Sequence, residues 1–239
     1  MSVQRVYNNL LHLNKHKASG PDGVSNWVLK EYAEILVTPV QNILNASYSE
    51  QKLPSMWKVA DVISLPKVKQ VTYPKKELRP ISLASTLSKI SEDFIFSDYI
   101  RPALESLVDS NQFGTISGSS TVLALISMSH KWLEATDGNS ASVRVLVFDY
   151  RKAFNLIDHK ILVNKLKQVN IRNSVINWDI DFLSGRSQTV KLGTDCILEC
   201  GTVLSGVPKG TKLGPWLFLL MINDLTVPSI LTRASHKKK

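Results

Sequence analysis

Hydrophobic residues recur every three or four positions through most of the first 135 residues, which predicts a largely helical amino-terminal half. Two stretches interrupt this pattern. Residues 18–23 are rich in turn-forming Gly, Pro and Asp, and residues 68–78 are polar and basic. We predict helices at residues 1–16, 25–36, 39–48, 87–107 and 119–135, a strand at 57–65, and a further element from residue 79.

The pattern changes at Val143, where an apolar run continues to Phe148 and predicts a buried strand that ends at Asp149. Two helices, a hairpin and a last buried helix follow this strand. The order of strand, helix, hairpin and helix is the beginning of a split βαβ, ferredoxin-like sheet, and the fold class is predicted to be α+β. The predicted elements are helices at 151–168 and 175–183, strands at 189–192 and 197–204, and a helix at 211–225.

The charge of the chain adds a candidate partner to this picture. The net charge is +9, and it is divided into +5 over residues 1–80, −2 over 81–160 and +6 over 161–239. Two basic flanks around a mildly acidic middle suit a polyanion such as nucleic acid, which is held at both ends and processed between them. Basic surfaces are also common on proteins that bind no nucleic acid, so charge alone leaves both interpretations open.

The distribution of apolar residues also bears on location. The amino terminus lacks the apolar run of a signal peptide, and the longest apolar run, residues 215–222, is much shorter than a membrane span. We therefore expect a soluble intracellular protein with no membrane association, in either the nucleus or the cytoplasm.

Asp149 is the candidate catalytic residue, because it lies at the carboxyl end of the predicted strand. A carboxylate in this position can bind a hard cation such as Mg²⁺, which prefers carboxylate oxygens. A single Asp in such a position is more often a helix N-cap. Phe154 five residues later is equally compatible with a core aromatic residue, so spacing alone leaves the function open.

The wider sequence is more specific. Residues 148–154 read Phe-Asp-Tyr-Arg-Lys-Ala-Phe, followed by His159, and this segment resembles the first catalytic motif of reverse transcriptases from non-LTR (LINE-type) retrotransposons. The resemblance implies that Asp149 binds both catalytic Mg²⁺ ions, with assistance from the carbonyl of Tyr150. It also implies that Phe154 is the steric gate that excludes a ribose 2′-hydroxyl.

A second segment, residues 205–215, is similar to the family's template- and nucleotide-contacting loop and helix. The resemblance implies that Gly206, Pro208 and Lys212 contact the template, and that Lys209 and Gly210 contact the nucleotide. Glycines in such a loop allow the backbone to approach a base pair or phosphate closely. A Gly- and Pro-containing loop taken alone is an ordinary turn.

The amino-terminal half resembles the fingers of the same family at residues 17–23, 57–67 and 79–83. There Lys67 and Arg79 would contact the incoming triphosphate, Arg through paired hydrogen bonds and Lys as a point charge. Taken singly, either residue is more often a solvated surface charge.

The resemblance covers about residues 8–228 and implies a right-hand polymerase fold. We expect mostly helical fingers at residues 1–140, an incomplete ferredoxin-like palm at 141–228, a basic tail at 229–239 and no thumb. The implied partners are an RNA template, a DNA primer and deoxynucleoside triphosphates, with Mg²⁺ as the cofactor.

Three departures from the family qualify this prediction. Asn155 stands where the family usually has Asp, and Lys209 stands where it usually has Gln. The family's Tyr-x-Asp-Asp motif, expected soon after residue 225, has no counterpart, since the sequence contains no Asp-Asp pair. We therefore expect a truncated reverse transcriptase domain that is inactive alone. The alternatives are a non-catalytic nucleic-acid-binding remnant and a decayed retroelement reading frame.

Overall fold

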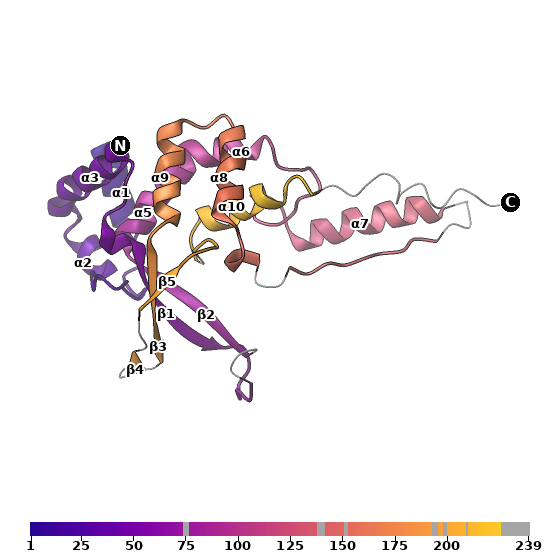
Figure 1. Cartoon of the computed structure of the whole chain (residues 1–239), viewed down its shortest axis with the longest axis horizontal. Coiled ribbons are helices and arrows are strands. Elements are labelled where there is room, and N and C mark those ends of the chain that lie inside the picture. Colours follow the sequence, from indigo (N-terminus) through magenta and orange to yellow (C-terminus); the bar gives the residue numbers. More distant parts are fainter. Residues whose placement is uncertain are drawn as a thin grey trace.

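The computed structural model describes residues 1–73, 77–137, 142–150, 153–192, 196–197, 200–208 and 210–225. The fold is α+β, as predicted: a body of packed helices carries a small mixed sheet that projects from it, and α7 extends away from the body on another side (Figure 1). None of the helices in the described residues is long and apolar enough to cross a membrane.

Most of the predicted elements form and follow one another in the predicted order. The helical elements are α1 (Val3–Leu11), α2 (Asn26–Glu31), α3 (Ala33–Glu50), η1 (Ser55–Lys58), α5 (Thr86–Ile95), η2 (Phe96–Ile100), α6 (Arg101–Glu105), α7 (Thr121–Thr136), η3 (Ala153–Asn155), α8 (His159–Gln168), α9 (Asn173–Leu183) and α10 (Leu213–Ile222). The strands are β1 (Val59–Pro66), β2 (Leu78–Ala84), β3 (Arg186–Leu192), β4 (Cys196–Ile197) and β5 (Gly201–Val203).

The predicted helix start at Pro39 is wrong, because Pro39 lies inside α3, which begins at Ala33. An internal proline removes one helical hydrogen bond and normally breaks a helix. Here the buried face continues through the proline, from Val37 to Val40 and Leu44. Burial of this face against the other helices offsets the lost bond, so α3 is continuous.

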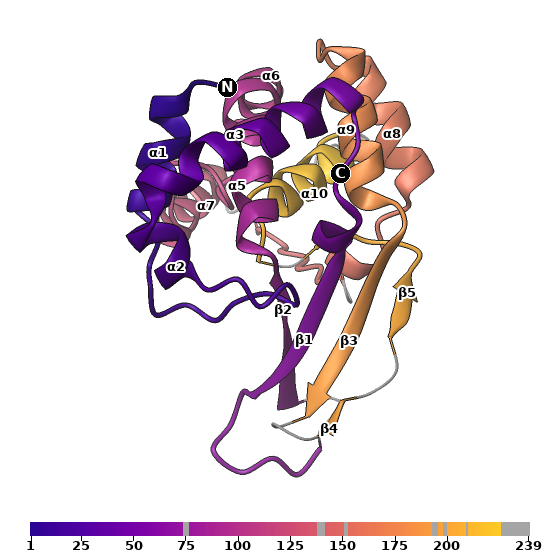
Figure 2. The same ribbon diagram turned by 90° about the vertical axis from the view of Figure 1, so that its left-hand side faces the viewer.

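The sheet joins the two halves of the chain. The strand order is β2-β1-β3-β4, with β5 paired to β3. β1 pairs antiparallel with β2, with Val62 opposite Ser82, and parallel with β3, with Val62 opposite Val190. Figure 2 shows β1 and β3 running side by side away from the helices. The predicted hairpin is confirmed, since β3 pairs antiparallel with β4 and β5.

A continuous hydrophobic core lies among the helices. Trp178 and Phe182 on α9 are almost fully buried, and their rings stack with centroids 5.5 Å apart. The Trp178 indole N–H donates to Ser47 Oγ on α3 over 3.0 Å, so its polar atom is satisfied inside the core. The other large side chains that are fully buried include Leu10, Leu44, Ile100, Leu162, Leu166, Leu183, Leu213 and Leu217.

α7 forms as predicted but buries none of its side chains. Ser120 caps it by accepting a hydrogen bond from the backbone N–H of Leu123 over 3.2 Å. Apolar side chains such as Val122, Leu125 and Leu133 remain largely exposed. Local sequence therefore determines this helix, and packing contributes little to it.

The predicted strand from Val143 to Asp149 is wrong, since residues 142–150 have no strand pairing. Leu146, Val147 and Phe148 are 77%, 89% and 82% exposed, although their pattern is typical of a buried strand. A strand forms only where a neighbour accepts and donates its ladder hydrogen bonds, and none of the described strands lies beside this segment.

The predicted helix at 151–168 begins later than expected, at His159. Asp158 is its N-cap, because the carboxylate accepts hydrogen bonds from the N–H groups of Lys160, at 2.7 Å, and Ile161, at 3.2 Å. Residues 151–152 lie outside the described residues. Residues 153–155 form the short helix η3 instead of a regular first turn.

We expect Leu162→Ala to lower the free energy of unfolding by about 2–5 kcal/mol, because Leu162 is completely buried and its truncation leaves a cavity. The matched control is Leu133→Ala on α7, where the side chain is 68% exposed and the expected change is within about 0.5 kcal/mol. Urea denaturation of both variants measures the difference. Equal losses would contradict the description of α7 as unpacked.

Candidate functional site

The loop of residues 205–212 packs directly on the segment 153–159. The Gly206 N–H donates to the carbonyl of Ile157 over 2.9 Å, and the Val207 N–H donates to the carbonyl of Phe154 over 2.8 Å. His159 Nε2 lies 2.7 Å from the Gly206 carbonyl, which accepts its hydrogen. Two segments that are fifty residues apart in the chain therefore form one unit, joined through backbone groups.

Gly206 is required for this close approach. Its φ is +85°, a region that side chains other than glycine adopt only with strain. A Cβ at this position would lie 2.5 Å from the carbonyl oxygen of Phe154 and 2.7 Å from Cα of Asn155. Both neighbours are backbone atoms, so neither can rotate away.

Aromatic contacts join the same unit to α10. The Phe154 ring is half-buried, with its centroid 5.1 Å from that of Phe218, and the Tyr150 ring meets Phe218 edge-on at 6.4 Å. Asp149 precedes Tyr150 in the exposed segment and makes no ion pair or hydrogen bond with the described residues. The structure thus gathers Tyr150 and Phe154 on α10 and leaves the carboxylate of Asp149 in solvent.

The far end of the loop is also fixed. The Thr211 hydroxyl donates to the carbonyl of Pro208 over 3.0 Å and accepts from the N–H of Gly214 over 3.1 Å. A Cβ at Gly210 would lie 3.8 Å from the carbonyl of Ser82, so this loop approaches β2. Lys212, an expected template contact, forms an ion pair with Asp93 of α5. Lys209, an expected nucleotide contact, lies outside the described residues.

Lys67 and Arg79 lie at the other end of the sheet. Lys67 follows the last residue of β1 and its backbone N–H donates to the carbonyl of Glu77 over 2.7 Å, while Arg79 is exposed opposite Leu65. Figures 1 and 2 place the β1–β2 turn at the free tip of the sheet, away from the helices. Lys67 and Arg79 are therefore close to each other. They are remote from the end of the sheet nearest the helices, where the 205–212 loop joins α10.

Besides Asp61, which forms an ion pair with Lys191 over 2.6 Å, three buried charged residues were missed by the sequence analysis: Glu92, Asp179 and Arg186. Burial raises the pKa of Glu92 to about 7, although the N–H groups of Leu213 and Lys212 act in the opposite direction by hydrogen bonding. Periodicity offered a signal, because Glu92 follows Ser88 by four residues on the buried face of α5.

Asp179 is the most unusual of the three. Its side chain is completely buried, and neither carboxylate oxygen has a hydrogen-bond partner among the described residues. Burial, and secondarily the charge of Glu92, holds the pKa of Asp179 well above its usual range. The Arg186 guanidinium instead stacks over the Phe182 ring at 4.9 Å, and burial lowers its pKa.

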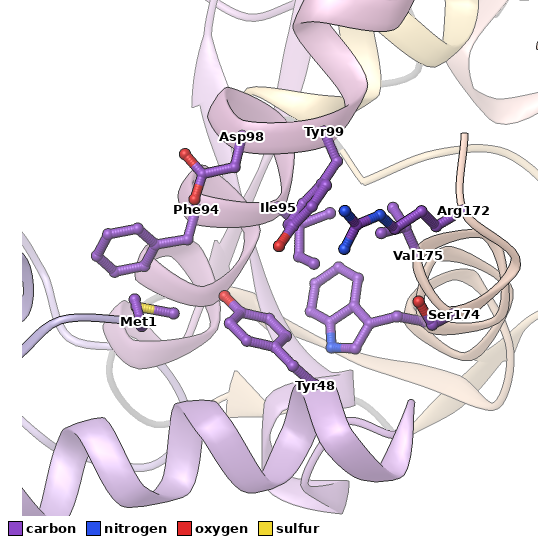
Figure 3. Close-up of a pocket in the computed structure, with 10 residues that line it drawn as sticks. Met1, Tyr48, Phe94, Ile95, Asp98, Tyr99, Arg172, Ser174 and Val175 are labelled. Atoms are coloured by element: carbon purple, nitrogen blue, oxygen red, sulfur yellow. The ribbon is translucent and has the colours of Figure 1, made fainter. Parts of the chain in front are cut away.

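A separate cavity of about 110 Å³ opens between α3, η2 and α9 (Figure 3). Tyr48, Tyr99 and Trp178 line it, and the Arg172 guanidinium points toward the tyrosine rings, 5.9 Å from the centroid of Tyr99. None of the residues assigned by the resemblance lines this cavity.

The described residues do not fit a catalytic Mg²⁺ pair. No group of three or more His, Cys, Asp or Glu side chains in the described part of the chain is arranged to hold a metal ion. Asp149 stands alone in solvent. Asp181 and Asp224 are engaged elsewhere, by Lys58 at 2.7 Å and Lys165 at 2.5 Å. A single carboxylate is a poor ligand set for two divalent cations.

Comparison with known proteins identifies the class. The family described as reverse transcriptase (RNA-dependent DNA polymerase) matches residues 65–232. Among relatives from Drosophila melanogaster, a probable RNA-directed DNA polymerase from transposon BS is 27% identical over 99% of this chain and 26% of its own length. A second, from transposon X-element, is 27% identical over 92% of this chain and 24% of its own length.

The chain therefore belongs to the reverse transcriptase family. Its relatives come from non-LTR retrotransposons; one further match is a Pol polyprotein from the type-1 retrotransposable element R2 of Popillia japonica, 22% identical over 72% of this chain and 24% of its own length. The chain spans about a quarter of the length of the curated relatives it matches. The resemblance derived from residues 148–154 and 205–215 is confirmed at the level of the family.

We expect Gly206→Ala to destabilise the protein by about 2 kcal/mol or more, because a Cβ would meet the backbone of Phe154 and the positive φ would be strained. The control is Gly201→Ala in β5, where a Cβ would meet no atom within 4 Å. Chemical denaturation measures both, and a harmless Gly206→Ala would show that the loop can separate from residues 153–159.

We expect Asp179→Asn to stabilise the protein increasingly as pH rises from 4 to 8. The raised pKa of Asp179 means that the folded chain keeps a proton the unfolded chain has lost, so stability falls as pH rises toward the folded pKa. The variant removes this penalty, by up to about 1.4 kcal/mol per pH unit. Melting curves of both proteins should converge near pH 4; a constant gap across this range would contradict the burial of an unpaired carboxyl group.

Proposed function

We propose that this chain forms the nucleotide- and template-contacting part of an RNA-templated DNA polymerase, and that by itself it binds nucleic acid without catalysing synthesis. The observation that carries this proposal is the direct packing of the 205–212 loop on residues 153–159. The resemblance assigns template and nucleotide contacts to the first segment and the sugar-selecting Phe154 to the second. Their contact through backbone hydrogen bonds is what a shared binding surface requires.

The roles proposed for individual residues follow the family motifs. Phe154, packed against Phe218, would lie against the sugar of the incoming nucleotide and exclude a 2′-hydroxyl. By the family motifs Lys67 and Arg79 would bind its triphosphate, although this structure holds them at the tip of the sheet, remote from Phe154. Lys209 and Gly210 would contact the nucleotide. Gly206, Pro208 and Lys212 would contact the template, with Lys212 exchanging its ion pair with Asp93 for a phosphate. Asp149 and the Tyr150 carbonyl would be the metal-binding groups.

The remaining parts of the proposal concern architecture and partners. In the right-hand description, residues 1–140 would be fingers, 141–228 part of the palm and 229–239 a basic tail. The partners would be an RNA template, a DNA primer and deoxynucleoside triphosphates. Mg²⁺ would supply charge neutralisation at the triphosphate, but the described residues offer only one carboxylate for it, so no catalytic step is assigned to this chain alone.

The exposed basic residues favour nucleic-acid binding as an activity that survives without catalysis. Arg79 is exposed at the tip of the sheet, and the net charge over residues 1–80 is +5. Phosphate contacts by Lys and Arg release counterions, so the affinity should fall steeply with salt concentration.

We expect the purified chain to bind single-stranded RNA with an affinity that decreases as salt rises, and Arg79→Ala to weaken binding and to lower the salt slope by about one. The matched control is Lys30→Ala, an exposed cation on α2 whose ammonium contacts the carbonyl of Leu13. Fluorescence anisotropy over a salt series measures both. Affinity that ignores salt would remove the support for phosphate binding.

Primer extension tests the other half of the proposal. With an RNA template, a DNA primer, deoxynucleotides and Mg²⁺, the purified chain should give no product, because Asp149 has no partner carboxylates among the described residues. Extension that disappears in Asp149→Ala and persists in Asp137→Ala, an exposed acid next to α7, would show that the chain is a complete polymerase and refute the proposal.

A further inference from the structure

The carboxylate of Glu92 anchors the end of the 205–212 loop, whereas residues 153–159 contact its beginning. Glu92 is on α5 and only 2% exposed, and its Oε1 accepts a hydrogen bond from the Leu213 N–H over 2.6 Å. The Lys212 N–H also bonds to this carboxylate. A single buried side chain therefore receives two consecutive backbone donors where the loop enters α10.

Neighbouring contacts reinforce this anchor. Asp93, the next residue of α5, forms an ion pair with the Lys212 ammonium. At the other end of α10, the Lys165 ammonium donates a hydrogen bond to the Met221 carbonyl over 2.6 Å. A carboxylate at the amino end and an ammonium at the carboxyl end both complement the helix dipole, so α10 is fixed along its axis by residues of other helices.

Glu92 is costly to bury, which distinguishes it from an ordinary helix cap. Its pKa is raised by burial, and it lies near the unpaired Asp179. A helix such as α8 is capped by its own exposed Asp158 at no such cost. The charged groups around Glu92 are Lys89 and Asp93 on α5, Asp179 on α9, Arg186 at the start of β3, and Lys212 before α10.

We propose that Glu92 is a positioning residue for the 205–212 loop: its buried carboxylate holds the two backbone donors at residues 212–213 and so presents the loop for template and nucleotide contact. This inference rests on the proposed function for its consequence in binding, but the positioning itself is a property of the folded chain. Residues 153–159 hold the beginning of the loop, and Glu92 holds its end.

Two consequences follow that a purely stabilising role does not share. Glu92→Gln keeps an oxygen acceptor but loses the charge, so the bonds to residues 212–213 weaken and the loop opens more often. The same substitution removes the cost of a buried ionised group, so overall stability at pH 8 should not fall. Local protection and global stability should therefore change in different directions.

The test is hydrogen–deuterium exchange of the full chain at pH 8, read on peptides that cover residues 205–214, with thermal melting in parallel. In Glu92→Gln we expect exchange in this segment to accelerate on the order of fivefold, with a melting temperature equal to or above that of the parent. The control is Glu105→Gln, an exposed acid of α6 paired with Arg101, which should leave the loop unchanged.

The pH dependence of amide exchange in the parent chain provides a second test, which needs no variant. Because burial raises the pKa of Glu92 to about 7, its charge-assisted bonds should be stronger at pH 8 than at pH 6. After correction for the intrinsic pH dependence of amide exchange, the loop should be better protected at pH 8 in the parent and equally protected at both pH values in Glu92→Gln.

RNA affinity separates this inference from the proposed function. If the parent binds a 20-nucleotide polyuridine RNA, Glu92→Gln should weaken that binding several-fold at pH 8. If the parent binds no RNA, the proposed function fails and the exchange measurements still decide the positioning role. The positioning role is overturned if loop exchange is unchanged in Glu92→Gln and is also independent of pH in the parent. It is overturned as well if exchange rises uniformly over the chain and the melting temperature falls.

Discussion

Burial of α10 is the constraint on which the arrangement of the candidate site depends. This helix is apolar on nearly all sides, and Leu213, Trp216 and Leu217 are within the core. Its proline, Pro215, lies in the first turn, where no helical hydrogen bond is lost. Because α10 is fixed in the core, Phe218 is presented to Phe154 and Tyr150, and the preceding loop is drawn against residues 153–159. The site is thus assembled by hydrophobic packing and oriented by a few backbone hydrogen bonds.

The charges buried around this helix have a different role from the apolar core. Glu92, Asp179 and Arg186 lie near one another in a low-dielectric region, yet Arg186 bonds to the Phe182 carbonyl over 3.1 Å and Asp179 bonds to none of the described residues. Such groups reduce stability at neutral pH, since burying a charge or a polar group without a partner is unfavourable. Glu92 is the exception in having two backbone donors at the start of α10. Stability and loop geometry are therefore linked in this region. As pH rises, ionisation of Glu92 makes its burial more costly but strengthens its hydrogen bonds to the loop.

Much of the fold was readable from the sequence because its signals are local. Ser25, Ser120 and the apolar periodicity specify helices where they occur, and the alternation around Val190 specifies a hairpin.

Features that depend on distant partners could not be predicted from the sequence. The parallel pairing of β1 with β3 joins residues more than a hundred positions apart, and burial of Glu92 becomes evident only once α10 is packed beside α5. Residues 143–149 show the converse: their composition favours a strand, but the described part of the chain offers no strand to pair with them. The motifs at 148–154 and 205–215 did predict the family.

The most direct measurement of the central claim is photo-crosslinking of the full chain to single-stranded RNA that contains 4-thiouridine, followed by mapping of the crosslinked peptides. If the 205–212 loop and residues 150–159 form one nucleic-acid-contacting unit, we expect crosslinks to concentrate in peptides that contain these two segments. Crosslinks confined to α7 or to the helices α1–α3, with neither segment modified, would contradict the assignment of this unit as the binding surface.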